Sequence, residues 1–225
     1  MNNRILTIQD FSSVGRCSLT VAIPIITALG HEVVGLPTAL LSTQTSGITG
    51  FTFNDLYSNM IPAFEHWKSL EIKFDCLYTG FLGTLECVDA TIKIATEMKK
   101  SGALIAIDPA MAENGKLYKI FNQEYYERMV ELCKLSNLFM PNFTEGKMLA
   151  GLNMPLEPNK ENANVILNIL NTKGFKSVVL SGIEDGDMCG TATLEKGLIT
   201  FQMNKKFDIY VHGAGDVLSS VIIGE

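Results

Sequence analysis

Two glycines, one small residue and an acid stand together in the run Gly213-Ala214-Gly215-Asp216. Glycine adopts positive φ angles and lets other groups approach the backbone closely, so both glycines predict a tight turn. Apolar residues at helical spacing follow, so the turn should open a helix. The first N–H groups of a helix lack intrahelical partners and lie at the positive end of its dipole. An anion is therefore expected to bind over residues 213–216.

Asp216 would repel a resting anion, so its position makes chemical sense if the carboxylate acts on a neutral hydroxyl beside that anion. An anion hole next to a carboxylate that takes a proton from an alcohol suits phosphoryl transfer to that alcohol. The alternative is structural, because acids are favoured in the first turn of a helix and glycines shape turns. This stretch alone leaves both interpretations open.

Apolar runs that end in polar residues predict the frame that positions these groups. Residues 4–9 predict a strand followed by a polar loop over 10–15, and 103–107 is a continuous apolar run typical of a buried parallel strand. The segment 84–100 has one apolar face, which predicts a helix. Further strands are expected at 32–41, 76–79, 138–140 and 177–180 and a hairpin over 190–203, with helices at 18–29, from Asn54 to about 68, at 123–135, from about 143 to 150, and at 162–172.

Strands that alternate with helices over most of the 225 residues predict one domain with a mainly parallel sheet and helices on both faces. Ligands of such sheets bind outside the carboxyl ends of the strands. Several polar residues are expected at these ends or in the loops after them, where a ligand would bind. They are Asp10, Thr45, Asp108, Asn142 and Asp216.

The composition narrows the function classes. A net charge of −6 without a Lys/Arg cluster argues against nucleic acid, and an acidic protein that handles phosphate needs a metal counter-ion. No apolar run is long enough to span a bilayer, so a soluble protein is expected. The N-terminal residues lack the features of a signal peptide, which favours the cytoplasm. The five cysteines are scattered, which indicates reduced thiols rather than zinc ligands or a disulfide framework.

Six short motifs follow one another along the chain. They are Ile8-Gln9-Asp10, Leu41-Ser42-Thr43-Gln44-Thr45, Tyr78-Thr79-Gly80-Phe81, Ile107-Asp108-Pro109-Ala110-Met111, Pro141-Asn142-Phe143-Thr144-Glu145 and Gly213-Ala214-Gly215-Asp216. Taken together, they resemble the pyridoxal/pyridoxamine kinases of the ribokinase superfamily, and the likeness runs from end to end. It implies an αβα sandwich, usually a homodimer. It also implies an ATP-dependent kinase that phosphorylates the 5′-hydroxymethyl group of a B6 vitamer in pyridoxal phosphate salvage, using Mg²⁺ and often assisted by K⁺.

On the catalytic side, the resemblance implies that Asp216 is the base and contacts the substrate hydroxyl. The backbone amides of Gly213, Ala214 and Gly215, with that of Asp216, then form the anion hole. Many family members have Thr where this chain has Ala214, so a hydroxyl near the phosphates is missing here, while the backbone amides remain.

On the nucleotide side, the resemblance implies that Asp108 and Glu145 are acids around the metal and the ATP phosphates. Asn142 and Ser181 are assigned to the ATP site with them. Oxygen ligands and intervening waters suit Mg²⁺. Asn142 and Glu145 are also spaced as the two members of a capping box and could simply start a helix. Both roles can hold at once.

On the vitamer side, Asp10 and Thr45 match positions that hold the polar groups of the pyridine ring, and Phe81 matches an aromatic position in the pocket. Structural alternatives are a loop acid, a turn hydroxyl and a core aromatic. Many members have Ser in place of Asp10 and Tyr in place of Phe81. A carboxylate at position 10 would favour a cationic ring nitrogen or amine. The sequence stops at Glu225, whereas family members continue, so the C-terminal helices that help cover the nucleotide are expected to be missing.

Two other functions compete with this interpretation. A hydroxymethylpyrimidine kinase of the same superfamily acts on another heteroaromatic hydroxymethyl group. Asp10, and an acid at 216 where those enzymes tend to have Cys, argue against it. A non-catalytic B6-binding or regulatory protein is the second alternative, and Ala214 favours it.

Overall fold

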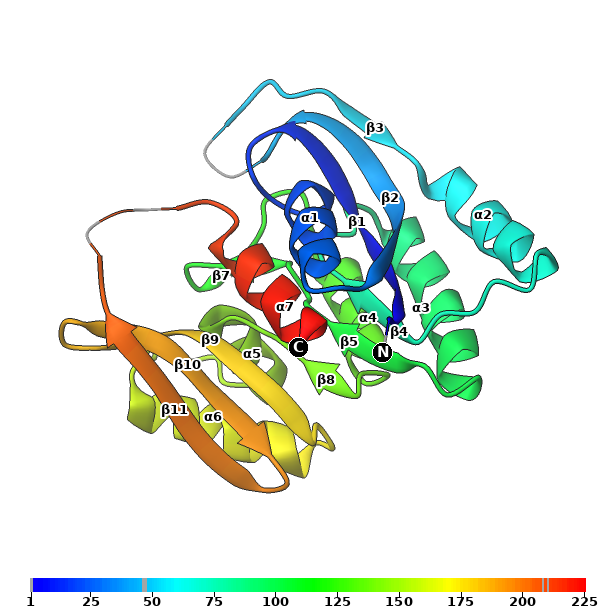
Figure 1. Cartoon of the computed structure of the whole chain (residues 1–225). Coiled ribbons are helices and arrows are strands. Elements are labelled where there is room, and N and C mark those ends of the chain that lie inside the picture. Colours follow the sequence, from blue (N-terminus) through cyan, green and yellow to red (C-terminus); the bar gives the residue numbers. More distant parts are fainter. Residues whose placement is uncertain (1, 46–47, 208, 210) are drawn as a thin grey trace.

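The computed structural model of the chain describes residues 2–45, 48–207, 209 and 211–225 (Figure 1). The strands are β1 Arg4–Val14, β2 Glu32–Thr43, β3 Phe53–Asp55, β4 Cys76–Thr79, β5 Leu104–Ile107, β6 Ala112–Glu113, β7 Lys116–Leu117, β8 Leu138–Phe139, β9 Ser177–Asp185, β10 Met188–Glu195 and β11 Leu198–Lys205. The helices are α1 Leu19–Ala28, α2 Tyr57–Ser69, α3 Leu85–Lys100, α4 Gln123–Cys133, α5 Phe143–Ala150, α6 Lys160–Thr172 and α7 Ala214–Gly224.

A nine-stranded sheet runs through the molecule in the order β11-β10-β9-β8-β5-β4-β1-β2-β3. Neighbouring strands within β9-β8-β5-β4-β1-β2 pair in parallel, whereas the outer strands β3, β10 and β11 pair antiparallel to their neighbours. Strands β6 and β7 form a separate small hairpin. The mainly parallel sheet expected from the alternation of strands and helices is therefore confirmed.

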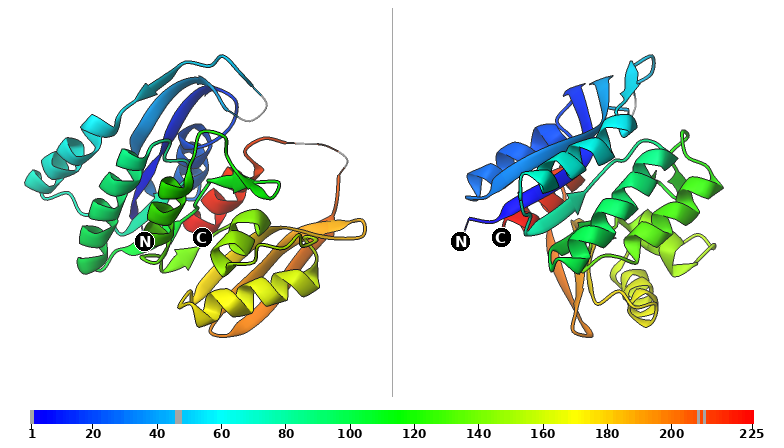
Figure 2. Two further views of the ribbon diagram at one scale, coloured as in Figure 1. Left: turned by 180° about the vertical axis from the view of Figure 1, so that it is seen from behind. Right: turned by 90° about the vertical axis from the view of Figure 1, so that its right-hand side faces the viewer.

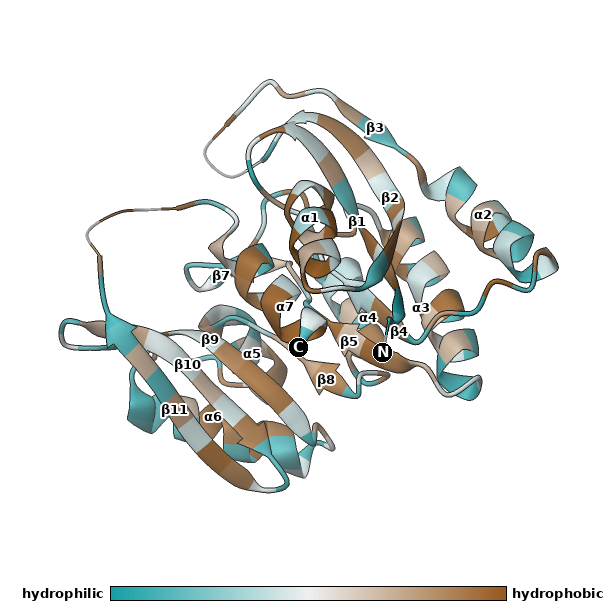
Figure 3. Ribbon diagram, in the orientation of Figure 1, coloured by the Kyte–Doolittle hydropathy of each residue, from teal (hydrophilic) through white to brown (hydrophobic). Residues whose placement is uncertain are grey.

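Helices cover both faces of the sheet (Figure 2). Successive residues of a strand point to opposite faces, so Leu6 and Ile8 join a core cluster with residues of α2 to α6. Ile5 instead packs with residues of α1 and α7. Figure 3 shows that β5, β8 and α7, which lie next to one another, consist largely of hydrophobic residues. The result is the αβα sandwich that the resemblance implies.

Local signals predict α3 well. Its N-cap Thr84 accepts a hydrogen bond from the Cys87 backbone N–H at 3.3 Å, and Lys99 and Lys100 end the helix. The hairpin expected over 190–203 is also confirmed, as strands β10 and β11. In both cases short-range features decide the structure.

Three boundaries differ from the sequence expectations. The loop predicted after Gln9 is wrong, because β1 keeps pairing with β2 beyond a register shift at this point and continues through Asp10. The prediction that Asn54 is an N-cap is wrong. Asn54 is a residue of β3 and pairs with Leu40 of β2, and α2 begins only at Tyr57. Strand β9 continues past residue 180, because β10 pairs along its whole length.

None of the helices described here is long and apolar enough to cross a bilayer. All five cysteines are free thiols, and Cys76, Cys87 and Cys133 are buried.

Candidate functional site

The start of α7 depends on one glycine. Gly213 is the N-cap, with a φ of +75°, and a Cβ at this position would lie 1.9 Å from the carbonyl oxygen of Arg16. No other residue fits this place without moving the backbone. Gly215 differs from the expectation, because it lies inside the helix without a positive φ and a Cβ there would meet no atom within 4 Å. The turn thus brings the α7 N-terminus against the loop that contains Arg16.

Asp216 lies in the first turn of α7 and is partly exposed. Burial raises the pKa of its carboxyl to about 6, and the charge of Asp10 raises it further, while the backbone N–H of Ser18 lowers it. A carboxylate with this pKa is ionised at neutral pH and accepts a proton more readily than an ordinary aspartate. The position therefore suits a general base beside a helix N-terminus.

Asp10 and Phe81 lie side by side, although they come from β1 and from the segment after β4. The backbone N–H of Asp10 donates to the carbonyl oxygen of Phe81 at 3.2 Å. The Asp10 side chain is 3 % exposed and accepts a hydrogen bond from the Ser12 hydroxyl at 2.7 Å. Burial raises the pKa of this carboxyl. A buried carboxylate whose backbone pairs with that of an aromatic residue suits a site for a cationic heteroaromatic ligand.

Cys17 lies close to both carboxylates, a placement that sequence reasoning missed. Burial raises the pKa of its thiol to about 11, and the charges of Asp10 and Asp216 contribute in the same direction. The thiol is therefore protonated at neutral pH. A single cysteine in a polar loop carries no sequence signal for this placement.

Asp108 follows β5 at its carboxyl end. One carboxylate oxygen accepts from the Ala110 N–H at 3.2 Å and the other from the Ser219 hydroxyl of α7 at 2.9 Å. Burial raises its pKa well above the usual range, with further contributions from the charges of Glu145 and Asp216. Asp108, Glu145 and Asp216 thus form one electrostatic group across three elements, which we call the acid group.

Glu145 completes the capping box at the start of α5. Its N–H donates to the Asn142 side-chain oxygen at 3.0 Å, and its own carboxylate accepts from the Asn142 N–H at 2.9 Å. Glu145 is 1 % exposed, and burial raises its pKa to about 7, against the effect of the backbone N–H groups that it accepts from. The capping box expected from the spacing is confirmed.

The remaining expected residues fall at the same edge of the sheet or near it. Ser181 pairs with Asn142 in a parallel bridge, so these two assigned ATP-site residues are neighbours. Thr45 is partly buried after β2, and the N–H of the preceding Gln44 donates to the carbonyl oxygen of Val14 at 2.8 Å. Residues 46–47, in the same polar loop, lie outside the described part of the chain.

An aromatic cluster beside the site was missed from the sequence. Phe121 stacks on Tyr125 with ring centroids 3.7 Å apart, and its ring also lies 5.7 Å from that of Phe81 and 6.0 Å from that of Tyr118. Burial raises the pKa of the Tyr118 hydroxyl, and the negative charges of the acid group add to this effect. The Tyr118 N–H donates to the carbonyl oxygen of Met111, whose own N–H donates to the Glu145 carboxylate, so Tyr118 lies near the acid group.

The acid group fits a divalent cation that is held partly by the phosphates of a bound substrate. In the described residues, no cluster of three or more His, Cys, Asp or Glu side chains could hold a metal ion. Mg²⁺, however, commonly binds through one or two carboxylates together with substrate phosphates and water. The buried negative charge around Asp108 is the kind of environment that such a cation stabilises.

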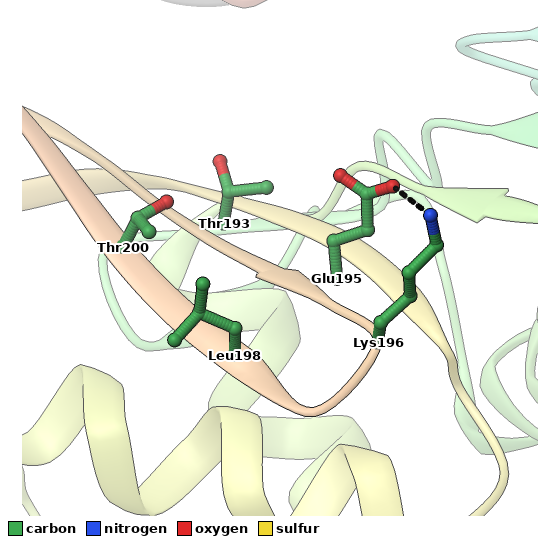
Figure 4. A pocket seen from close by; sticks show the side chains of 5 residues that line it. All are labelled: Thr193, Glu195, Lys196, Leu198 and Thr200. Atoms are coloured by element: carbon green, nitrogen blue, oxygen red, sulfur yellow. Dashed lines mark ion pairs between the residues drawn. The ribbon is translucent and has the colours of Figure 1, made fainter.

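A depression of about 270 Å³ lies elsewhere, at the hairpin between β10 and β11 (Figure 4). Its side chains include Thr193, Thr200 and the ion pair of Lys196 with Glu195, whose charged atoms are 3.9 Å apart. Both members of this pair are largely exposed, so the depression has no buried charge to recognise a ligand. The acid group, together with Asp10 and Phe81, remains the candidate site.

Comparison with known proteins gives one family and several relatives. The family model described as phosphomethylpyrimidine kinase matches residues 23–225. The structure of pyridoxal kinase from Lactobacillus plantarum is 31% identical, with a TM-score of 0.87, over 99% of this chain and 79% of that chain. A protein from Bacteroides thetaiotaomicron, described as a phosphomethylpyrimidine kinase and solved with pyridoxal, is 30% identical, with a TM-score of 0.91, over 100% of this chain and 80% of that chain. A curated pyridoxal kinase from Dictyostelium discoideum is 22% identical over 86% of this chain and 74% of its own length.

Proposed function

The chain belongs to the phosphomethylpyrimidine kinase family, and from this premise we propose that it transfers the γ-phosphoryl group of ATP to the 5′-hydroxymethyl group of a B6 vitamer. The observation that carries the proposal is the pair of carboxylates near Cys17. Asp216 lies at the anion-binding start of α7, and Asp10 lies buried beside Phe81. One carboxylate can act on the hydroxyl while the other holds the positive charge of the ring nitrogen or an amine.

The chemistry follows from these positions. The backbone N–H groups at the start of α7 bind the γ-phosphate and stabilise the charge that develops on its oxygens. Asp216 accepts the proton of the vitamer hydroxyl as the oxygen forms its bond to the γ-phosphorus. The bond between that phosphorus and the β,γ-bridging oxygen breaks, and ADP leaves.

Mg²⁺, when bound, would neutralise charge on the ATP phosphates. Asp108 is the residue that we propose to hold it. Among the described residues, one of its oxygens accepts from the Ala110 N–H and the other from the Ser219 hydroxyl, which leaves lone pairs for a cation. Asn142 and Ser181 lie together at the next strand ends and are proposed to contact the nucleotide. Thr45 is proposed to contact the vitamer.

The same resemblance supports further parts of the proposal. They are a single ribokinase-like domain over 1–225, a homodimer, and assistance by K⁺. Sedimentation of the purified chain tests the dimer, and assays with K⁺ replaced by Na⁺ test the monovalent cation.

The test is ATP turnover with pyridoxal, pyridoxamine, pyridoxine and hydroxymethylpyrimidine side by side, with the phosphorylated product identified by mass. We expect a 5′-phosphorylated B6 vitamer and ADP in equal amounts, and about a hundredfold less of both, or lower still, with Asp216→Asn at matched times. A hydroxymethylpyrimidine kinase, which the family description favours, would turn over only the pyrimidine. Vitamer binding without ADP formation would indicate a regulatory protein.

A further inference from the structure

The β6–β7 hairpin is attached to the N-terminus of α5 by a buried carboxylate. One oxygen of Glu145 accepts from the backbone N–H groups of Met111 and Ala112, at 2.8 and 3.2 Å. The other oxygen accepts from the N–H of Asn142. Three backbone donors from two segments therefore converge on one side chain.

Two neighbours of Glu145 hold other parts of the same hairpin. The side-chain N–H of Asn142 donates to the carbonyl oxygen of Ala112 at 2.8 Å. The backbone N–H of this same Ala112 donates to Glu145. The hydroxyl oxygen of Thr144 accepts from the N–H of Gly115, in the turn between β6 and β7, at 3.0 Å. The first residues of α5 thus fix both the base and the turn of the hairpin.

The hairpin carries Tyr118 to the site. The N–H of Tyr118 donates to the carbonyl oxygen of Met111 at 2.9 Å, which closes the hairpin directly at the residue that Glu145 holds. The Tyr118 ring contacts Phe121, and the ring of Phe121 lies against Phe81 in the vitamer pocket. Any loosening at Met111 would therefore reach the aromatic cluster and the acid group together.

Glu145 has little capacity left for another ligand. A carboxylate offers about four lone-pair sites, and three are taken by backbone N–H groups. Asp108 accepts two hydrogen bonds in the described part of the chain, from Ala110 and Ser219, and it is the more exposed of the two acids. The two acids, equivalent in the sequence interpretation, differ in what they contact.

We propose that Glu145 is a positioning residue, which fixes the hairpin over 111–118 and so holds Tyr118 near the acid group, while Asp108 is the acid that serves the metal. The inference rests on the proposed function, since the phosphate site is the one assigned to the kinase. It gives the capping box a second task, which is to hold a wall of the active site.

Hydrogen exchange of the metal-free, nucleotide-free chain tests the attachment. In Glu145→Ala, the amides of Met111, Ala112 and Tyr118 should exchange at least roughly tenfold faster, because their acceptor or the closure that depends on it is lost. Glu145→Gln keeps one oxygen, so the amides of Met111 and Ala112 should stay protected while that of Asn142 exchanges faster. Unchanged exchange at these amides in Glu145→Ala would overturn the proposal.

Kinetics separate positioning from metal binding. Glu145→Gln should keep the Mg²⁺ half-saturation within about twofold of the wild type, and Glu145→Ala should raise the KM for ATP several-fold more than it lowers kcat. A raised Mg²⁺ requirement in Glu145→Gln, with protected hairpin amides, would show that Glu145 binds the metal. If Glu145→Ala does not fold, Thr144→Val tests the same attachment at Gly115 alone, where faster exchange is expected and unchanged exchange would count against it.

Glu161→Gln is the matched control, because this glutamate is also in the first turn of a helix, α6, but is exposed. It should leave the exchange of the hairpin amides and the kinetics as in the wild type. If it changed them as much as the Glu145 variants do, loss of any first-turn acid would explain the effect, and the specific role of Glu145 would be wrong. The exchange experiment needs no turnover. It can therefore succeed even if the vitamer assay fails, and it can fail while the kinase activity stands.

Discussion

The hydroxyl of Ser219 donates a hydrogen bond to the carboxylate of Asp108 at 2.9 Å, and so joins α7 to the end of β5. Ser219 follows Asp216 by three positions, so the two side chains lie on neighbouring turns of the same helix face. One helix therefore carries the proposed base and also holds the proposed metal acid. This bond fixes the distance between the two functions.

Ser219→Ala should weaken the use of Mg²⁺. The hydrogen bond lowers the pKa of Asp108, so its loss favours the protonated acid and should raise the Mg²⁺ half-saturation by roughly three- to tenfold. Ser220→Ala is the control, because Ser220 is also buried and its Oγ meets no hydrogen-bond partner among the described residues. Equal Mg²⁺ titrations of the two variants would contradict the role of Ser219.

Asp216→Asn should lower kcat by about 10²–10⁴-fold with little change in vitamer and ATP binding, because it removes the base and keeps the shape. The folded pKa lies above the ordinary value of 3.8, so the fold disfavours the ionised acid. That cost is present above pH 6 and disappears below pH 4. The variant should therefore be at least as stable as the wild type at pH 8 in urea unfolding. Turnover above a tenth of the wild-type rate would remove Asp216 from the mechanism.

The pH dependence of kcat should show the same group. A base must be ionised, so the rate should fall as the pH falls through about 6, by about tenfold per unit well below that value. Stopped assays between pH 4.5 and 8, with MgATP saturating at each pH, measure this limb. The residual activity of Asp216→Asn should lack the limb, and a limb shared by both proteins would assign it to another residue.

Gly213→Ala should be far more harmful than Gly215→Ala. The added Cβ would press against the carbonyl oxygen of Arg16 and also needs an unfavourable positive φ, which together should cost about 2–4 kcal/mol of the free energy of unfolding. At Gly215 the same methyl meets no atom within 4 Å, inside a helix, where Ala is favoured over Gly. Thermal unfolding of both variants measures the difference, and similar losses would mean that the close approach at Arg16 is not tight in solution.

Asp10→Asn should change vitamer preference. Replacing a buried carboxylate by an amide removes the charge that favours a cationic amine, so kcat/KM for pyridoxamine should fall roughly tenfold more than that for pyridoxine. Ser12→Ala removes only the hydrogen bond to this carboxylate. It should therefore lower kcat/KM less than Asp10→Asn does, and by the same factor for the two vitamers. An equal fall for both vitamers in Asp10→Asn would assign Asp10 a structural role.

The features that were predictable from the sequence are those that short segments determine. Thr84 caps α3 and the Asn142–Glu145 pair caps α5, since N-cap, spacing and periodicity all lie within a few residues. The start of α7 at Gly213 was visible for the same reason. Six ordered motifs gave the family, which tertiary structure and comparison confirm.

What could not be predicted depends on partners far along the chain. Asp10 remains in a strand because β2 pairs beside it, and Asn54 is a strand residue rather than a cap for the same reason. The β6–β7 hairpin has strands of two residues, too short for any periodic pattern, so Tyr118 went unnoticed. Likewise, the spacing marks Glu145 as a cap of α5, but only the fold shows that its carboxylate also accepts from the N–H groups of Met111 and Ala112.

Helix α7 packs on α1. A ring nitrogen of His31, between α1 and β2, lies 3.0 Å from the carbonyl oxygen of Gly224, 193 residues further along the chain. Contacts of such long sequence separation require the closure of large loops and so tend to form late. The two halves of the pocket, at Cys17 and at Gly213, therefore meet only when most of the sheet exists. Partly folded chains have no pocket to fill, so vitamer and nucleotide should stabilise the completed fold alone and slow its unfolding.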